Sequence, residues 1–314
     1  MKRLFLLSLF LISCLFLLLS LLIGPTGFPS AKQPLIILQI RLPRSILAYL
    51  CGSSLGIAGA SLQGLLMNPL ADTYILGMSG GAALGAVLAF IFNLEKFSHG
   101  LGVPILACAG AFFSLLLVLS IARKKGEMPV ERVILAGVIV GAFLWSLVTL
   151  LLSFSGEDAY RILLWLMGSL SNAEWASVKL AIFPIIIGCL FLLFLWRELD
   201  AFSLGEEVAG YLGVEANKAK ILIVIFSSLA VAGAVSTCGI IGFIGLISPH
   251  IARRLVGYNH KILLPASYFV GASILLLSDT LAKTLIAPAE LPVGAITALL
   301  GAPFFAYLLQ KKDR

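Results

Sequence analysis

The sequence has 314 residues, of which 60% are hydrophobic and only 12% are charged, and its mean hydropathy is +1.08. A soluble domain has roughly 45–50% apolar and about 25% charged residues, so this composition excludes a water-soluble globular fold. A membrane-spanning helix takes about 20 apolar residues. The composition therefore predicts an all-α, polytopic membrane protein and leaves no room for a soluble catalytic domain.

The hydropathy pattern predicts ten membrane spans along the chain. The first, at residues 4–23, follows a basic N-terminus but is longer than the core of a signal peptide, which has about 7–15 residues, so we expect it to be retained. The other nine are expected at residues 46–66, 74–92, 101–122, 133–154, 180–196, 221–237, 240–256, 263–286 and 293–309.

Lysine and arginine residues are distributed unequally between the two ends of these spans. With the N-terminus inside, fifteen fall at inner ends and seven at outer ends. The inner set is Lys2, Arg3, Arg123, Lys124, Lys125, Arg132, Arg197, Lys218, Lys220, Arg253, Arg254, Lys261, Lys311, Lys312 and Arg314, and the outer set is Lys32, Arg41, Arg44, Lys96, Arg161, Lys179 and Lys283. The positive-inside rule therefore predicts a multi-pass protein of the cytoplasmic (inner) membrane with both termini in the cytoplasm, and it accounts for the net charge of +7 without a nucleic-acid partner.

Small residues at four-residue spacing predict close contacts between helices. The second span carries Gly52, Gly56, Ala60 and Gly64, and the third carries Gly77, Gly81, Gly85 and Ala89. Such stripes let helix backbones approach one another, so we expect a compact bundle. Pro69 and Pro249 stand near span ends, where we expect the helices to end or bend and the freed carbonyls to be buried in protein. The five cysteines are scattered singly, which is typical of small buried hydrophobic residues.

The longest hydrophilic stretch, residues 197–220, holds five of the fifteen acidic residues and has a helical pattern of its own. Ser203 and Glu206 have the spacing of a capping box, and Gly213 suits a C-terminal cap. Leu204, Val208, Tyr211 and Leu212 share one helical face. The pattern predicts a short amphipathic cytoplasmic helix, a turn and a second short helix over residues 214–220. An amphipathic helix that lies on lipid normally carries Lys and Arg, whereas this one is acidic, which favours a protein partner.

The sequence contains no motif that carries catalysis. It has no phosphate-binding loop, no zinc-protease motif, and no Ser/His/Asp set that periodicity would bring together, so we expect no enzyme activity, no catalytic residue, no metal site and no cofactor in this chain. His250 is either a ligand or proton carrier, or a packed residue near a helix end. Asp279 and Lys283, four residues apart, are expected to pair on one helix face. Proton- or sodium-driven transporters usually mark their pathway with such intramembrane ionisable groups, which are otherwise nearly missing here.

Several motifs, in order, resemble the FecCD-type permeases of ABC importers for iron-siderophores, haem and vitamin B12. They are Arg41-Leu42-Pro43-Arg44, the Gly-rich helix through Gln63, Asn68-Pro69-Leu70-Ala71, Leu76-Gly77, residues 239–254, Leu264-Pro265, Gly271-Ala272, Asp279, residues 290–294 and residues 301–305. The resemblance implies the ten-helix bundle of type II ABC importers such as the vitamin B12 importer, with residues 1–314 as a single permease domain. It also implies two permease subunits (a homodimer, or a heterodimer with a sister permease), two ATPase subunits that hold ATP and Mg²⁺, and an extracytoplasmic substrate-binding protein.

The resemblance also implies roles for particular residues. The coupling helix that enters the ATPase groove corresponds to Leu204, Gly205, Glu206, Glu207, Gly210, Tyr211, Leu212 and Gly213. Arg41, Arg44 and Lys283 correspond to basic positions that face acidic residues of the binding protein; anchoring of a helix end to lipid phosphate is the alternative for the two arginines. Val130 and Glu131 fall near the expected cytoplasmic gate.

The leading hypothesis is therefore an importer permease that carries a ferric siderophore, with haem or cobalamin as alternative cargo. An ion-coupled secondary transporter is a second hypothesis from a different class, and a polytopic membrane enzyme is a third. An acidic coupling helix distinguishes the first from the second, because a transporter that works alone needs no helix fitted to an ATPase.

Overall fold

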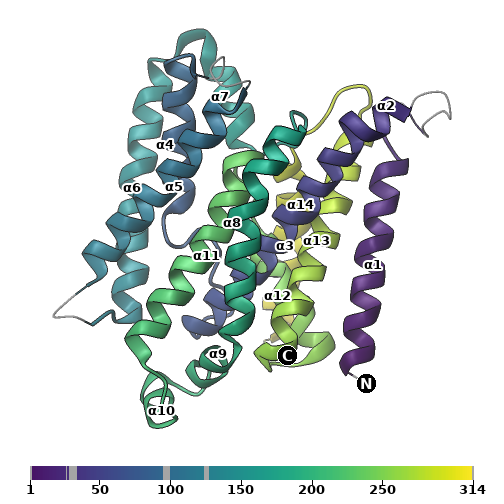
Figure 1. The fold of residues 1–314 in the computed structure, drawn as a ribbon. Helices are drawn as coiled ribbons and strands as arrows, with labels where there is room; N and C mark the ends of the chain where they lie inside the picture. The colour runs from purple at the N-terminus through teal and green to yellow at the C-terminus, as the bar shows by residue number, and fades with distance from the viewer. Residues whose placement is uncertain (1, 26, 28–33, 95–99, 124–126, 313–314) are drawn as a thin grey trace.

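The computed structural model describes residues 2–25, 27, 34–94, 100–123 and 127–312, and this part of the chain is a bundle of helices (Figure 1). Lys32, Lys96, Lys124, Lys125 and Arg314 from the charge count lie outside the described residues. Within them, a helix stands at each expected span. These helices are α1 (Lys2–Leu22), α3 (Leu42–Leu65), α4 (Met78–Ile91), α5 (Gly102–Ala122), α6 (Val130–Ser153), α8 (Trp175–Phe194), α11 (Ala216–Cys238), α12 (Ile244–Val256), α13 (His260–Thr284) and α14 (Val293–Lys312).

Two of these helices, α4 and α12, are shorter than the expected spans. In the described part of the chain, seven helices are long and apolar enough to cross a membrane, and α4, α12 and α14 are not among them. At 1.5 Å per residue, the 14 residues of α4 and the 13 residues of α12 reach only about 20 Å, less than the hydrocarbon thickness of about 30 Å. Irregular segments at residues 66–77 and 239–243 precede these two helices.

Six short elements complete the described chain: α2 (Pro34–Ile36), the π-helical η1 (Ile37–Arg41), the 3₁₀ helix η3 (Gly156–Asp158), α7 (Ala159–Leu166), α9 (Trp196–Phe202) and α10 (Glu206–Tyr211). The second span begins earlier than expected, because η1 runs directly into α3 and Pro43 fits the first turn of that helix. Arg41 and Arg44 are therefore helical residues.

Helix α3 is the centre of the bundle. It contacts α1, α8, α11, α12 and α13, and nearly all of its residues are buried. The predicted glycine contacts are confirmed: a Cβ atom on Gly56 would overlap the carbonyl of Ser267 on α13, and one on Gly81 of α4 would overlap the carbonyl of Gly110 on α5. Helices α4, α5 and α6 form a second group, which α11 joins to α3.

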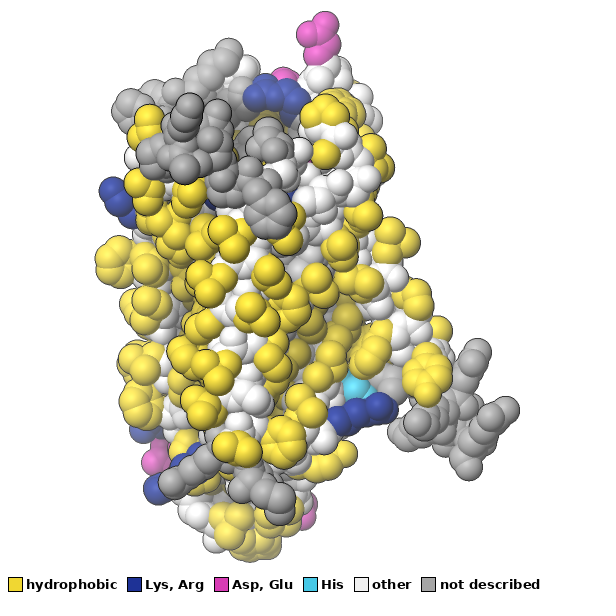
Figure 2. Space-filling model, turned by 90° about the vertical axis from the view of Figure 1, so that its right-hand side faces the viewer, with side chains coloured by type: hydrophobic (Ala, Val, Ile, Leu, Met, Phe, Trp, Pro, Cys, Tyr) yellow, Lys and Arg dark blue, Asp and Glu magenta, His cyan; other side chains and the backbone are white. Residues whose placement is uncertain are grey.

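The surface of the bundle has the distribution of side chains that a bilayer requires. On the face shown in Figure 2, hydrophobic side chains cover the middle, whereas Lys, Arg, Asp and Glu gather toward the two ends. Figure 1 places both ends of the chain at the end of the bundle that carries α9 and α10.

Candidate coupling, docking and translocation sites

The hydrophilic segment folds as two short helices, α9 and α10, followed by α11. The predicted capping box does not form. The Oγ of Ser203 donates instead to the carbonyl of Leu199 (3.0 Å), and the residue that precedes the first turn of α10 is Gly205, at φ +108°. The prediction of a separate second short helix over residues 214–220 is also wrong, because the chain from Ala216 onward already belongs to α11. Those residues continue into an apolar span, so they extend the longer helix.

The C-terminal cap of α10 is confirmed. Gly213 has φ +84°, its amide donates to the carbonyl of Gly210 (3.0 Å), and the amide of Val214 donates to the carbonyl of Ala209 (3.1 Å). This pair of bonds is a Schellman motif, which requires a left-handed residue that glycine adopts without strain. The motif fixes the direction in which the chain leaves α10.

The apolar face of α10 points away from the chain's own bundle. Tyr211 is 89% exposed, and Leu204, Val208 and Leu212 are exposed as well, whereas Ala209 is the buried residue of the helix. Next to this face, α9 and the end of α10 border a hollow of about 310 Å³. It is lined by Trp196, Arg197, Asp200, Ala201, Leu204, Leu212 and Val214. An exposed apolar face beside a hollow is suited to a protein partner.

Two polar contacts join this segment to the bundle. Glu206 of α10 bonds to the buried Nζ of Lys220 on α11 (2.6 Å). Asp200 of α9 accepts the backbone N–H of His260 (2.8 Å) and lies 2.7 Å from its Nδ1, at the first turn of α13. A displacement of the two short helices would therefore act directly on α11 and α13 through these contacts.

At the opposite end of the bundle, Arg44 of α3 is held by two carboxylates. Its Nε and Nη2 donate to Asp279 of α13 at 2.9–3.1 Å, and its Nη1 donates to both oxygens of Glu290 at 2.9 Å. The planar guanidinium group thus binds one carboxylate through its Nε and Nη2 and the other through its Nη1. The network ties α3 to α13 and to the connection that leads into α14.

The other two predicted docking cations lie beside this network. Lys283 donates to the carbonyl (2.8 Å) and the Oγ (3.1 Å) of Ser20, and it lies 3.6 Å from Asp279, which confirms the expected i,i+4 pair. Arg41 donates to backbone carbonyls at the end of α1, including that of Leu22 (2.9 Å).

All three cations are inside the chain rather than on its outer surface. Arg41, Arg44 and Lys283 are only 5%, 8% and 2% exposed. Their hydrogen bonds within the chain hold all three side chains in the bundle. Docking through these positions stays a prediction.

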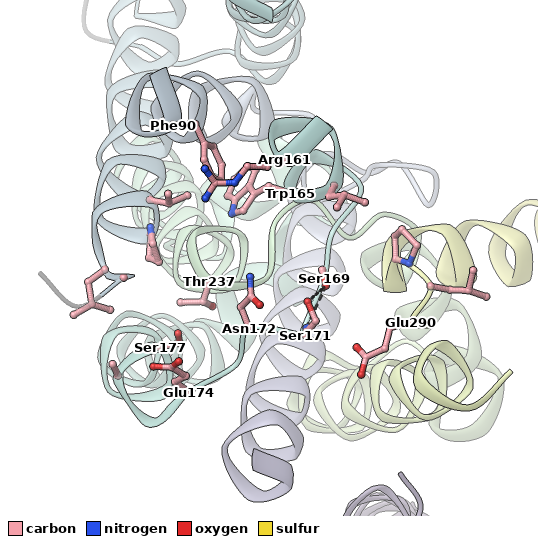
Figure 3. A pocket seen from close by; sticks show the side chains of 18 residues that line it. Phe90, Arg161, Trp165, Ser169, Ser171, Asn172, Glu174, Ser177, Thr237 and Glu290 are labelled. Carbon is pink, nitrogen blue, oxygen red and sulfur yellow. Dashed lines mark hydrogen bonds between the residues drawn. The ribbon is translucent and has the colours of Figure 1, made fainter. Parts of the chain in front are cut away.

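A cavity with both polar and apolar lining opens between the helix ends opposite α9 and α10; these helix ends are called the outer ends below, after the predicted orientation (Figure 3). It has a volume of about 570 Å³ and is lined by residues of α4, α5, α7, α8, α11 and the connections around them. In Figure 3, Arg161 and Trp165 of α7 lie on one side, Glu290 lies on another, and Ser169 bonds to Ser171 between them (2.9 Å). Arg161 also lies over the ring of Phe90 (5.5 Å).

In the interior, the two irregular segments are bonded to each other. The hydroxyl of Tyr74 donates to the carbonyl of Ile241 (3.2 Å) and accepts its N–H (3.1 Å), so one side chain satisfies both backbone groups of a non-helical residue. Non-helical backbone within a membrane protein needs such internal partners.

Gln63 performs a similar role beside the proline of α12. Pro249 has no N–H to offer the carbonyl four residues earlier, that of Gly245, and the Nε2 of Gln63 donates to this carbonyl (3.4 Å). The Oε1 of Gln63 accepts a bond from Arg253 (2.6 Å). The alternative that the helix ends at Pro249 is wrong, because α12 continues to Val256, whereas the freed carbonyl is buried in protein, as expected.

The remaining predicted residues have simple positions. Val130 and Glu131 form the first turn of α6, where a carboxylate is favoured by the helix dipole, and Glu131 is exposed. The ring of His250 packs edge-on against Phe304 (5.6 Å), so the packed alternative describes its surroundings. The gate stays a prediction.

Sequence reasoning missed several contacts. Glu290 lies within a recognised motif, but its pairing with Arg44 spans 246 residues, and no local pattern reveals it. Cys51 and Cys238, expected as isolated residues, have their sulfur atoms 3.1 Å apart. The amphipathic α7 was also missed, although its apolar run Ile162–Leu166 is a usable signal.

Comparison with known proteins identifies the family. The model of the FecCD transport family matches residues 3–311. The chain is 44% identical over 287 residues to the Fe(3+)-citrate import system permease protein of Bacillus subtilis, covering 89% of this chain and 83% of that protein. It is 41% identical over 287 residues to the cobalamin import system permease protein of Halobacterium salinarum, covering 91% and 76%. It is 40% identical over 284 residues to the hemin transport system permease protein of Yersinia pestis, covering 88% and 83%.

A solved structure agrees with this assignment. It is described as an inward-facing conformation of a metal-chelate type ABC transporter, and it matches with a TM-score of 0.89 and 36% identity over 98% of both chains. Permease subunits of such transporters are not enzymes themselves, since ATP is hydrolysed by the partner ATPase. The chain belongs to the FecCD family of ABC transporter permeases.

Proposed function

We propose that this chain is the membrane-spanning subunit of an ABC importer that carries an iron chelate, with a ferric siderophore as the first candidate cargo. The observation that carries the proposal is α10, whose apolar face is exposed while Glu206 and Asp200 fasten its surroundings to α11 and α13. Among the relatives compared above, those named for Fe(3+)-citrate and hemin support iron, and the one named for cobalamin keeps vitamin B12 as the alternative.

The assembly follows from the same reasoning. The whole chain would act as one permease domain in the inner membrane, with both termini cytoplasmic, because the charge split and the position of α9 and α10 agree in orientation. A second permease copy, two ATPase subunits and an extracytoplasmic binding protein would complete it. The residues from Leu204 to Gly213 would contact the ATPase, the outer network around Arg44 would lie under the binding protein, and Val130 and Glu131 would lie near the inner gate.

Reconstitution tests the class and the cargo together. The chain is inserted in liposomes with its cognate ATPase and binding protein, and ATP hydrolysis and uptake are measured with ferric siderophore, haem and cobalamin in turn. Stimulation and uptake with the ferric siderophore would support the proposal. Uptake with haem or cobalamin alone would refute the cargo, and uptake that needs no ATPase would refute the class.

A pair of substitutions at Gly210 tests the coupling surface. Gly210→Pro removes a backbone donor within α10 and should break this one-and-a-half-turn helix, so ATPase binding should be lost. Gly210→Ala is the matched control, because a Cβ atom at this position meets nothing within 4 Å. Equal ATPase binding by the two variants would show that α10 is not the coupling surface.

A further inference from the structure

The two carboxylates that hold Arg44 differ in how firmly the fold retains them. The side chain of Asp279 is completely buried on α13, whereas that of Glu290 is 26% exposed. Glu290 follows the end of α13 and lies in the connection that leads into α14. It also lines the outer cavity (Figure 3), which Arg44 does not, and it contacts the guanidinium group directly.

The charges in this network are balanced. Among the ion-paired groups, Arg44 and Lys283 supply two cations and Asp279 and Glu290 supply two anions, linked in the order Glu290, Arg44, Asp279 and Lys283. Arg41, beside them, bonds to backbone carbonyls. Removing Glu290 would leave one positive charge in excess next to the outer cavity. Such a charge attracts a carboxylate, and a guanidinium group with a free edge binds a carboxylate with two parallel bonds.

We propose that Glu290 is a displaceable mask: it occupies the outer edge of Arg44 in the undocked chain, and an acidic side chain of the extracytoplasmic binding protein replaces it on docking. This inference rests on the proposed function, since it assumes that such a protein docks at this end. The exchange keeps the network neutral, because one carboxylate leaves as another arrives. Docking then replaces an internal ion pair by an intermolecular one, so its net gain is small and the complex can separate after delivery.

The exchange also gives docking a route into the bundle. Glu290 and its neighbours lead directly into the first turn of α14, where Gly294 packs so closely on the carbonyls of Met167 and Ile240 that a Cβ atom would overlap the first of them. Release of Glu290 from Arg44 frees the start of this connection. The binding protein therefore acts on α14 and on the irregular segment that contains Ile240 without touching either.

The test is the affinity of the binding protein for variants of the assembled transporter in nanodiscs. Glu290→Gln removes the competing charge but keeps an oxygen that can accept from Arg44. The expected result is tighter docking, on the order of tenfold, because each tenfold corresponds to only about 1.4 kcal/mol and coupled charge pairs at interfaces reach more than this. The affinity of the variant should also fall more steeply with salt, since a cation that has lost one counter-charge now contributes to it.

Glu174→Gln is the matched control. Glu174 lines the same cavity, is exposed, and undergoes the same change of charge (Figure 3). It should leave the affinity near that of the unmodified chain. If both variants tighten docking equally, the effect comes from the net charge of this end of the bundle and the mask is refuted. If Glu290→Gln weakens docking or leaves it unchanged, Glu290 is only a structural partner of Arg44, and the mask is refuted as well.

Two further arms keep the outcomes distinct. Should Glu290→Gln fail to fold, Glu290→Asp takes its place: the shorter side chain withdraws from Nη1 without loss of charge, and the same tightening is expected. Absence of any docking by the unmodified chain would refute the proposed function itself. Docking by the unmodified chain that neither Glu290 variant strengthens would refute the mask and leave the proposed function standing.

Discussion

Asp279→Asn is expected to be one of the most destabilising single changes in the half of the bundle opposite α9 and α10. Asp279 is completely buried, accepts three bonds from Arg44 at 2.9–3.1 Å, and lies 3.6 Å from Lys283. The substitution leaves two buried cations with only the partly exposed Glu290 as a counter-charge. Removal of one partner from a buried ion pair costs about 3–5 kcal/mol, and because asparagine keeps one acceptor oxygen, we expect about 3 kcal/mol.

The measurement is the apparent free energy of unfolding from SDS titration in mixed micelles. Asp158→Asn is the control, since it breaks an exposed pair with Arg161 at 3.4 Å, and surface pairs contribute about 0–1 kcal/mol. Glu290→Gln should fall between the two because Glu290 is partly exposed. Equal effects of Asp279→Asn and Asp158→Asn would refute the reasoning, because Arg44 and Lys283 would then not depend on the carboxylate of Asp279 for neutralisation. A cost of Glu290→Gln as large as that of Asp279→Asn would argue that Glu290 is not displaceable.

Two other changes test the interior. Gly59→Ala should reduce the yield of folded protein and destabilise it by about 1–3 kcal/mol or more, because its Cβ atom would overlap a backbone carbonyl of α12, whereas Gly242→Ala meets nothing within 4 Å and should be tolerated. Thermal unfolding in detergent measures both, and equal melting temperatures would contradict the contact. Tyr74→Phe should cost about 1–3 kcal/mol because both backbone groups of a buried residue lose their partner, while Tyr211→Phe, at an exposed position, should have no measurable effect in the SDS titration. A neutral Tyr74→Phe would mean that water replaces the hydroxyl.

Polar contacts at the two ends of the bundle meet on one helix, α13. On the side of α10, Asp200 contacts the first turn of α13, and at the other end Asp279 of the same helix is held by Arg44. Helix α13 is therefore held by polar contacts near both of its ends. A rigid helix fixed in this way moves as a body, which is how packed elements usually transmit small displacements.

The sequence by itself determined the helical segments, their order and much of their packing. A run of about twenty apolar residues in lipid must satisfy its backbone groups internally, as a helix does, so the hydropathy pattern was sufficient to place the helical segments. The glycine stripes and the pair of Asp279 and Lys283 depend on neighbours three or four residues apart, which helical geometry fixes. The exposed face of α10 followed from the same periodicity.

Only the tertiary structure decided which partners the polar groups take. Ser203 and Glu206 have the spacing of a capping box, yet Glu206 turns instead to Lys220, because a buried ammonium group needs a counter-charge more than an exposed helix end needs a cap. The sequence predicted that Arg44 faces a partner protein, but in the structure it binds two carboxylates of its own chain, 235 and 246 residues away. Local periodicity determines the face of a helix on which a residue stands, whereas the charge that neutralises it depends on which distant helix packs there.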